Sequence, residues 1–377
     1  MNRRRFLAVL GGGTIVAATG VGAWLGTRTP ALALEPWSLA GSAYDEPRRR
    51  ALSYALLAPN PHNLQPWRVA LDEPDIVTLF ADGSLALPHT DPFDRQLTIG
   101  LGCFLELMRM AAAADGYAVE IEPFPEGWSA EGLDQRPIAR ATFAKAEAET
   151  DPLFAHVLER RSNKEPFDTE RAVDAASLAA MVEAARTISA GGSVEADDVA
   201  FWRALTAQAI EIEARTPRTH KESVDLFRIG RAEIEANPDG IDLGGPFLEG
   251  LSKVGLLSRE GVADPASAQF QQGLDATLGP ARSSMGHVWL VSKDNERPTQ
   301  LAVGADWLRM NLAATAQGLG FQPHSQALQE YAEMEDLYAR THARLAGEGG
   351  TVQMLARIGH GPEVAPAPRW RLERRMM

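Results

Sequence analysis

An expected helix and an expected strand are joined by an unusual turn, Pro59-Asn60-Pro61-His62-Asn63-Leu64-Gln65-Pro66-Trp67. Its prolines fix the backbone at little entropic cost, and the side-chain amide of Asn63 can both donate and accept hydrogen bonds. A rigid amide of this kind suits the edge of a heterocycle that alternates acceptors with a donor. The same residues also suit a purely structural turn in which Trp67 starts a core strand. From the turn alone, both interpretations stay open.

A second segment has residue types that could bind a ligand. It runs from Glu159 to Asp168 and contains Arg160, Arg161, Ser162 and Lys164. A phosphate monoester carries about −1.5 to −2 charges and accepts paired hydrogen bonds from guanidinium groups. One of the two arginines together with the Ser162 hydroxyl would suit that task. The alternative is that these cations complement the carbonyl end of a helix.

Together the two segments resemble motifs of the nitroreductase family of FMN enzymes. The turn is similar to the family's Pro-Ser-X-X-Asn-X-Gln-Pro-Trp, although Asn60 and Pro61 replace its usual small polar residues. The arginine-rich segment is similar to the family's Arg-X-Ser-X-Arg/Lys, which in relatives holds the FMN phosphate. The resemblance covers roughly residues 45–170 and 283–372 and implies FMN as the cofactor.

The resemblance also implies roles for single residues. Lys164 would lie at the N1–O2 edge of the flavin, where negative charge develops on reduction. Ser325 lies in a segment that relatives place beside the flavin N5, although their acidic residue is missing here. Arg369 matches the family's terminal phosphate-binding arginine, and Arg282 is a further phosphate candidate; on charge patterning alone, Arg369 also fits a solvated basic tail. The candidate cofactor-binding residues are Pro59, Asn60, Pro61, Asn63, Arg160, Arg161, Ser162, Lys164, Arg282, Ser325 and Arg369. No catalytic acid or base is predicted, because the flavin carries the chemistry.

An internal repeat indicates duplication: Gly102 to Gly116 aligns with Gly304 to Gly318, 202 residues later. The turn occurs once, in the first half, and the arginine-rich segment occurs once, in the second. Members of the family are homodimers with FMN at the subunit interface. The resemblance therefore implies a single-chain pseudo-dimer that keeps one site, as in the subgroup typified by Acg. The predicted fold is α+β, with two nitroreductase-like halves at 34–150 and 151–377 whose antiparallel sheets are packed by helices.

Hydrophobic patterning places the elements of both halves. Helices are predicted over 48–57, 102–115 and 304–317, with another opening at Asp151-Pro152. Strands are predicted over 67–71, 76–80, 119–122, 138–143, 285–292 and 352–358. Residues 172–235 are expected to be helical, and residues 236–282 show no sustained period. Long excursions are often lids, so the insertion 172–282, with its turns at 237–240 and 244–246, is expected to cover the flavin.

Residues 1–33 are typical of a targeting segment. They begin Asn2-Arg3-Arg4-Arg5-Phe6-Leu7, continue apolar to Gly26 and reach Ala31-Leu32-Ala33, an Ala-X-Ala processing site. The opening is similar to the twin-arginine export signal and predicts a periplasmic or cell-envelope protein that meets the export machinery. The alternative is an uncleaved membrane anchor, because the 21 residues from Phe6 to Gly26 are just long enough to span a bilayer.

Composition excludes several classes. The 377 residues are 45% hydrophobic and 23% charged, with 37 Lys and Arg against 50 Asp and Glu and a net charge of −13. A general nucleic-acid-binding surface needs clustered positive charge and is not expected. Cys103 is the only cysteine, so no intramolecular disulfide or cysteine-rich metal site can form.

The expected function is that of an FMN-dependent oxidoreductase. NAD(P)H is the expected electron donor, and a nitro or quinone-like compound is the expected acceptor. One alternative is a protein that holds flavin under the insertion 172–282 with little turnover. Another is an interaction protein with a vestigial site.

Overall fold

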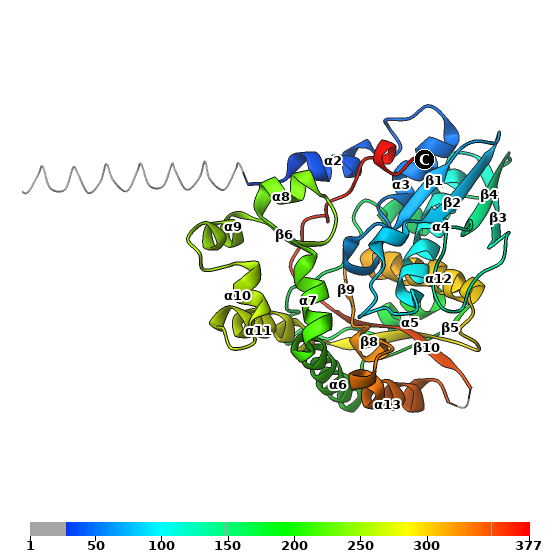
Figure 1. Cartoon of the computed structure of the whole chain (residues 1–377). Coiled ribbons are helices and arrows are strands. Elements are labelled where there is room, and N and C mark those ends of the chain that lie inside the picture. Colours follow the sequence, from blue (N-terminus) through cyan, green and yellow to red (C-terminus); the bar gives the residue numbers. More distant parts are fainter. Residues whose placement is uncertain (1–27, 148, 348) are drawn as a thin grey trace, which may run out of the picture.

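Two four-stranded antiparallel sheets form the frame of the molecule (Figure 1). The computed structural model describes residues 28–147, 149–347 and 349–377. The first sheet has the order β1-β2-β4-β3, and its strands are β1 (Trp67–Ala70), β2 (Ile76–Ala81), β3 (Tyr117–Pro123) and β4 (Ala139–Lys145). The second has the order β5-β8-β10-β9, and its strands are β5 (Ser189–Ser193), β8 (Gly286–Ser292), β9 (Gly320–Pro323) and β10 (Thr351–Gly359).

Two long helices, α4 (Arg95–Ala114) and α12 (Arg297–Ala316), pack against each other between the sheets (Figure 1). Both are buried on nearly all sides, which explains why their sequences show no polar face. By length and composition α4 could cross a membrane, the one such helix in the described part of the chain. Because 89% of its apolar window is buried inside the protein, it is a core helix here.

The two halves repeat one topology. Each has a short helix, two strands, a long helix and two further strands, and each sheet takes the same strand order. The short helices are α3 (Pro47–Ala55) and α5 (Ala175–Glu183), which pack on α4 and α12 respectively. This repetition confirms the duplicated α+β fold.

Two glycines mark the crossing of α4 and α12. A Cβ atom on Gly102 would lie 2.1 Å from the carbonyl oxygen of Leu301, and one on Gly304 would lie 2.0 Å from that of Ile99. Gly304 and Leu301 are the repeat equivalents of Gly102 and Ile99, so the contact is reciprocal, as a two-fold relation requires.

Replacing Gly102 with alanine should therefore destabilise the protein. The new methyl group meets backbone, which cannot move aside as a side chain can, so the two central helices must separate. We expect the free energy of unfolding in urea to fall by at least about 1–3 kcal/mol. Gly279→Ala is the matched control, because that helical glycine has open space around its Cβ position. Alanine there should be neutral or stabilise by up to about 1 kcal/mol, and equal losses in the two variants would contradict the close crossing.

The predicted strands and long helices are confirmed to within a few residues, except that α4 and α12 each begin seven residues earlier than predicted. Three expectations about the second half were wrong. The helix expected at Asp151-Pro152 is a 3₁₀ turn, Pro152–His156. Residues 172–235 are not continuously helical, because β5 and β6 (Phe227–Ile229) interrupt them. Residues 236–282 are regular, with one strand and three helices.

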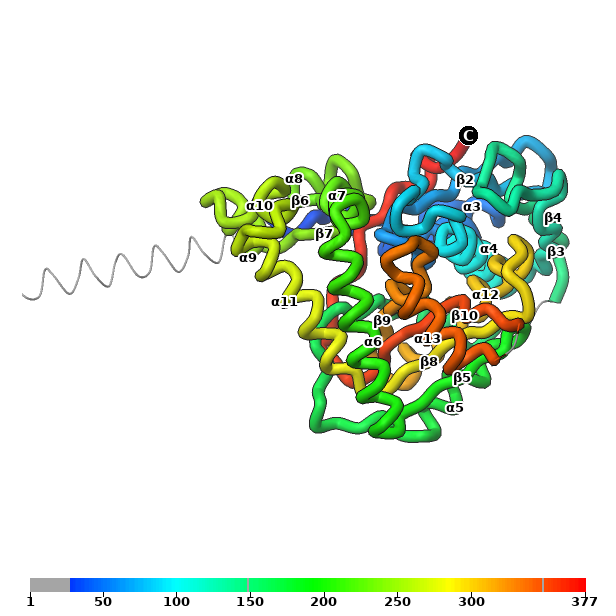
Figure 2. The backbone as a smooth tube through the Cα atoms, turned by 60° about the horizontal axis from the view of Figure 1, so that its bottom comes forward, coloured from blue at the N-terminus to red at the C-terminus, as the bar shows by residue number. Residues whose placement is uncertain are grey.

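The segment between β5 and β8 has no counterpart in the first half, where β1 and β2 are joined by residues 71–75. We call residues 194–285 the inserted segment. Figure 2 shows α6 and α11 running from the second sheet toward α8 and α9. Its elements are α6 (Ala196–Arg215), α7 (Pro217–Asp225), β6, α8 (Gly230–Ala236), β7 (Ile241–Leu243), α9 (Pro246–Lys253), α10 (Arg259–Ala263) and α11 (Ala268–Arg282). Helix α5 and strand β5, which fall within the predicted insertion 172–282, lie in the second half's own layer.

Both ends of the described chain return to the first half. Helix α2 (Ala31–Leu39) packs beside α3, and Trp37 enters the main core. At the other end, Met376 pairs with Val69 in a parallel bridge beside β1. The remaining α-helix of the described residues is α13 (Glu335–Leu345). Of the predicted targeting segment, residues 1–27 lie outside the described residues.

A buried histidine on the second sheet should make stability depend on pH. His287 on β8 is fully buried, and neither of its ring nitrogens has a hydrogen-bond partner within the described residues. Burial, together with the charges of Arg203 and Arg357, lowers its pKa to about 3. An imidazole in the unfolded chain keeps its ordinary pKa of about 6.5, so the unfolded state binds the proton first as pH falls.

Stability contributed by neutral His287 should thus be complete above about pH 6.5 and decline as pH falls toward about 3, by roughly 1.4 kcal/mol per pH unit. Urea unfolding at neutral and mildly acidic pH, on the wild type and on His287→Phe, measures this. The variant should show the shallower dependence, and equal slopes would contradict the assignment.

Candidate functional site

The predicted turn adopts an uncommon backbone. It forms a 3₁₀ turn over Pro61–Asn63, and three residues that are not glycine have positive φ: His62 at 46°, Asn63 at 56° and Gln65 at 56°. Each such residue costs free energy, and such strain gathers at functional sites. Asn60 holds the turn closed, because its side-chain oxygen accepts from the Gln65 amide at 2.7 Å and its Nδ2 donates to the Ala58 carbonyl at 3.1 Å. Both ends of the Asn60 side chain are therefore used within the turn.

The C-terminal segment meets this turn through two amide side chains. Asn63 donates to the carbonyl of Pro368 at 3.0 Å, and its oxygen accepts from Arg369. Gln65 is fully buried, and its oxygen accepts from the Trp370 amide at 2.9 Å. Gln65 was part of the recognised motif, but its contact with Trp370 could not be read from the sequence because 305 positions separate the two.

The inserted segment reaches the same turn. Gln65 Nε2 donates to the carbonyl of Pro238 at 2.7 Å, and Trp370 Nε1 donates to Asp239 at 2.9 Å. Arg228 closes the group with an ion pair to Asp239 at 2.6 Å. We call these three interactions the insertion contact. They bring the predicted covering turn at 237–240 onto the predicted flavin turn.

Three guanidinium groups converge behind the turn. Arg160 donates to the carbonyl of Leu57 at 2.9 Å, and Arg369 donates to the same carbonyl at 3.2 Å. Arg161 follows Arg160 directly, and its charge lowers the pKa of both other arginines. The pKa of Arg160 falls to about 10, mainly through burial, and that of Arg369 falls well below its usual value for the same reason. No carboxylate within the described residues forms a hydrogen bond or ion pair with any of the three.

The three arginines differ in their free donors. All five N–H groups of Arg369 are occupied: Asn63 accepts one, and the carbonyls of Leu56, Leu57, Ala58 and Pro368 accept the others. In contrast, the buried Nε atoms of Arg160 and Arg161 have no partner within the described residues. Arg369 thus anchors the C-terminal segment to the end of α3, and Arg160 and Arg161 keep capacity for an anion.

Helix α2 contributes an aromatic side chain, Trp37, whose role the sequence did not predict. The guanidinium of Arg161 lies 4.7 Å from the centre of the Trp37 ring, and that of Arg369 lies 5.6 Å from it. Trp37 Nε1 donates to the carbonyl of Ala367 at 2.8 Å, which fixes the ring. A guanidinium held over an aromatic face can still donate through the N–H groups at its edge. No pattern in residues 34–44 signals this role.

Lys164 lies between the turn and the inserted segment. It is exposed, yet surrounding protein lowers its pKa, while Asp242 on β7 acts in the opposite sense. The charge of Lys164 also acts on His62, because burial and Lys164 together lower the pKa of His62 to about 4. Lys164 therefore acts electrostatically on one residue of the turn and one of the inserted segment.

Arg357 is a second residue that sequence reasoning did not assign. This buried β10 side chain donates to the carbonyls of Asn163 at 3.1 Å and Glu165 at 2.7 Å. Its guanidinium lies 3.8 Å from the centre of the Phe167 ring. Arg357 thereby positions the segment that carries Ser162 and Lys164.

The other predicted cofactor-binding residues have fewer contacts with the turn and the arginine cluster. Ser162 is partly exposed beside Arg161. Ser325 is buried, with its hydroxyl 3.8 Å from the sulfur of Met354. Arg282 is exposed in the last turn of α11 and forms no hydrogen bond or ion pair with the described residues, so the structure does not bring it to the arginine cluster. Pro59 and Pro61 act through the backbone of the turn.

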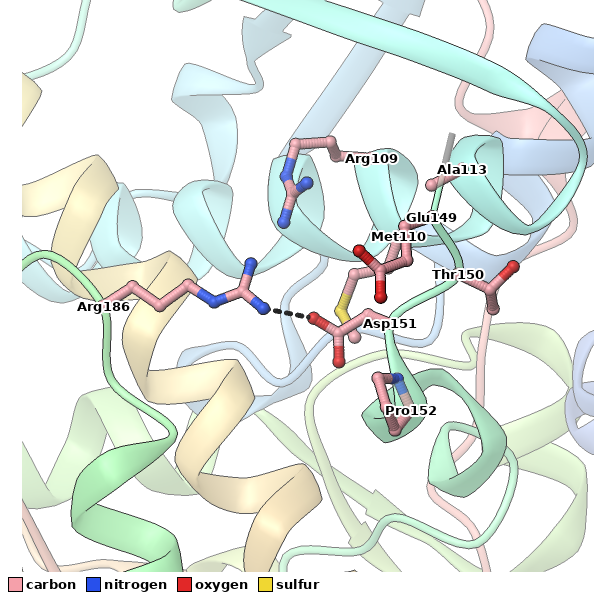
Figure 3. Close-up of a pocket in the computed structure, with 8 residues that line it drawn as sticks. All are labelled: Arg109, Met110, Ala113, Glu149, Thr150, Asp151, Pro152 and Arg186. Carbon is pink, nitrogen blue, oxygen red and sulfur yellow. Dashed lines mark hydrogen bonds and ion pairs between the residues drawn. The ribbon is translucent and has the colours of Figure 1, made fainter. Parts of the chain in front are cut away.

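A pocket of about 250 Å³ lies elsewhere, between α4 and the segment that joins the halves (Figure 3). It shares no residue with the site above, and each of its arginines is already paired with a carboxylate. Arg186 pairs with Asp151 at 2.9 Å, and Arg109 pairs with Glu106 at 2.7 Å. The pocket therefore offers an anion less than the arginine cluster does. Its lining residues are Arg109, Met110, Ala113, Glu149, Thr150, Asp151, Pro152 and Arg186.

Two curated relatives match most of the chain, although no family model does. A Mycobacterium tuberculosis protein named "Putative NAD(P)H nitroreductase acg" is 28% identical over 331 residues, which cover 85% of this chain and 91% of that protein. A second protein of that organism with the same description is 27% identical over 330 residues, covering 85% of this chain and 88% of its own length. The chain is thus similar to two proteins that are described as nitroreductases.

Solved nitroreductase structures match part of the chain. An FMN-bound nitroreductase from Bacteroides fragilis is 12% identical, and the match covers 59% of this chain and 95% of that one at a TM-score of 0.35. The FMN-dependent nitroreductase NfnB of Mycobacterium smegmatis, in complex with NADPH, is 17% identical and gives a TM-score of 0.34 over 59% of this chain and 96% of that one. With matches this loose, the fold assignment rests on the repeated topology itself.

Proposed function

We propose that this chain binds FMN and acts as an oxidoreductase that passes electrons from NAD(P)H to a nitro or quinone-like acceptor. The observation that carries the proposal is the arginine cluster beside the strained turn. Buried guanidinium groups without a bonded carboxylate are costly, and an anion that accepts from the free Nε atoms of Arg160 and Arg161 would offset that cost.

The residues present fit FMN. Arg160, Arg161 and Ser162 would hold the phosphate, with Trp37 fixing the plane of Arg161. The backbone of the turn from Asn60 to Gln65, whose side-chain amides are already bonded within the protein, and the ammonium group of Lys164 would border the ring system. Positive charge there would favour the reduced, more negative form. Bound FMN would supply acceptance of a hydride from a nicotinamide and its delivery to the acceptor. Arg369 fits a supporting role, since its donors are already used.

Steady-state kinetics test the activity. Purified protein loaded with FMN should oxidise NAD(P)H with saturation and reduce a quinone or nitroaromatic in step with it. Ping-pong kinetics are expected, because donor and acceptor would use one site in turn. Bound flavin without any such turnover would contradict the enzymatic proposal.

The insertion contact favours a second candidate, a protein that holds FMN under cover. Its bonds to Gln65 and Trp370 attach the inserted segment directly to the proposed flavin turn. If this cover limits access, Asp239→Asn should loosen it while keeping an acceptor for Trp370. Loss of one charge-assisted bond of about 1.5 kcal/mol should then speed anaerobic reduction by NAD(P)H by roughly tenfold.

The matched control for that experiment is Glu260→Gln, an exposed carboxylate of the same inserted segment. Stopped-flow reduction of the three proteins gives the comparison. Equal rates of flavin reduction in all three proteins would contradict a cover that limits access. The proposal of an enzyme with an open site would then stand.

We further propose that residues 1–33 direct export to the cell envelope by the twin-arginine route. The support is the sequence Arg3-Arg4-Arg5-Phe6-Leu7 and the apolar run to Gly26. Fractionation of producing cells with and without Arg3→Lys and Arg4→Lys tests it, since loss of the arginine pair should leave the protein in the cytoplasm.

A further inference from the structure

Exposed apolar side chains gather on and after helix α9. Phe247 is 73% exposed, Val254 69% and Leu256 61%, and Leu32 on α2 is 61% exposed. These are four of the eight large apolar side chains that are exposed in the described part of the chain. Single exposed apolar residues are ordinary, but a group of them marks a surface with a partner. We call these four residues the α9 face.

The helices that carry or precede these four residues, α2 and α9, are linked to each other through Arg28 and α8. Arg28 donates to Glu249 of α9 at 2.9 Å, which ties the start of the described chain to that helix. Helix α8 packs on both α2 and α9. Figure 1 shows α8 and α9 on the side of the molecule away from the first sheet, with α2 between α8 and α3.

Charge does not oppose an apolar partner here. From Pro246 to Ser258 the sequence carries one acid, Glu249, and one base, Lys253. Glu249 is buried and accepts from Arg28 and from the Arg231 amide, and Lys253 pairs with it at 3.1 Å. Lysine can also extend its charged end toward lipid headgroups while its stem stays on an apolar surface.

The chain itself indicates which partner covers this face. The apolar sequence from Phe6 to Gly26 is long enough to span a bilayer, and a single residue separates it from Arg28. That distance is at most about 7 Å of extended chain, so residue 28 must lie close to wherever the apolar sequence ends.

Helix α2 is built into the fold rather than appended to it. Ala33 is 2% exposed, and its carbonyl accepts from the Arg369 amide at 2.8 Å. Processing after Ala33 would remove the first residues of this helix and that bond. These contacts favour retention of the N-terminal segment.

We propose that the α9 face rests on a lipid bilayer, in which the apolar N-terminal segment remains as an anchor. Phe247, Val254 and Leu256 then enter the boundary between headgroups and acyl chains, about 5–10 Å deep. The inserted segment would thereby have a second contact, with the membrane, besides its contact with the turn.

Site-directed spin labelling of the full chain tests this. Cys103 is the only cysteine and is buried, so a cysteine introduced by Phe247→Cys or Val254→Cys takes the nitroxide alone. Met377→Cys is the matched control, because Met377 is 67% exposed beside β1 of the first half. Each protein is reconstituted with vesicles of phosphatidylcholine and phosphatidylglycerol, and collision with oxygen is compared with collision with a water-soluble nickel chelate.

The ratio of oxygen to nickel collisions should rise severalfold at positions 247 and 254 on vesicles and stay unchanged at 377. Ratios at 247 and 254 equal to that at 377 would overturn the proposal. Immobilised labels without a gain in oxygen collision would also overturn it, because they would indicate a protein partner or a second copy. Failure of the full chain to float with the vesicles would do the same.

Discussion

Replacing Arg161 with alanine should weaken FMN binding by about 10- to 150-fold. The variant removes a charge-assisted hydrogen bond to the phosphate, worth about 1.5–3 kcal/mol. Arg161 is only half-buried, and its own bonds go to the neighbouring carbonyls of Leu158 and Arg160, so the fold should survive its loss. Fluorescence titration of the apoprotein with FMN measures the change.

Riboflavin binding distinguishes contacts with the FMN phosphate from contacts with the flavin ring. It lacks the phosphate, so its affinity should be nearly the same for wild type and Arg161→Ala. Arg282→Ala is the control variant and should leave both affinities unchanged, because that side chain is exposed and away from the cluster. An Arg161→Ala protein that binds FMN like the wild type, or loses riboflavin equally, would contradict the assignment.

Replacing Arg369 with alanine should instead cost stability, with or without flavin. Its five donors join the C-terminal segment to the last carbonyls of α3 and to Asn63. Removing them leaves buried carbonyls without partners, and we expect the free energy of unfolding to fall by about 3–5 kcal/mol. Relief of repulsion from Arg160 and Arg161 offsets part of this loss.

Urea unfolding of the apoprotein makes the measurement. Arg371→Ala is the control, since that side chain is half-exposed and pairs only at the surface with Glu35, and its cost should stay within about 0.5 kcal/mol. Arg369→Lys should lose most of what alanine loses, because an ammonium group cannot reach all five acceptors. An apoprotein of unchanged stability that binds FMN poorly would show that Arg369 is a phosphate ligand after all.

The regular parts of the fold were predictable because their signals are local. Strands β1, β2, β8 and β10 are rich in apolar residues, and the repeat of α4 in α12 is visible at the paired glycines. The inserted segment was not predictable in the same way. Within residues 236–282, where no period was found, helices α9 and α10 have eight and five residues, too few turns for periodicity to register.

The residues of the candidate site also fall into those that local sequence predicts and those that only the fold reveals. Motif residues such as Asn63 and Arg161 are found from their neighbours in sequence. Gln65, Trp37 and Arg357 act through partners more than a hundred residues away, so their roles need the fold. Arg369 shows the limit most clearly: its type and position suit a phosphate ligand, but only the structure shows that every donor is already used.

The presence of a flavin site is the central claim, and the flavin content of the purified full-length protein tests it most directly. The protein, isolated and then incubated with excess FMN and desalted, should retain close to one FMN per chain, seen by its visible absorption. Binding at a single site follows from the one turn and the one arginine cluster. A protein that stays colourless after this treatment, or that retains two flavins per chain, would contradict the account.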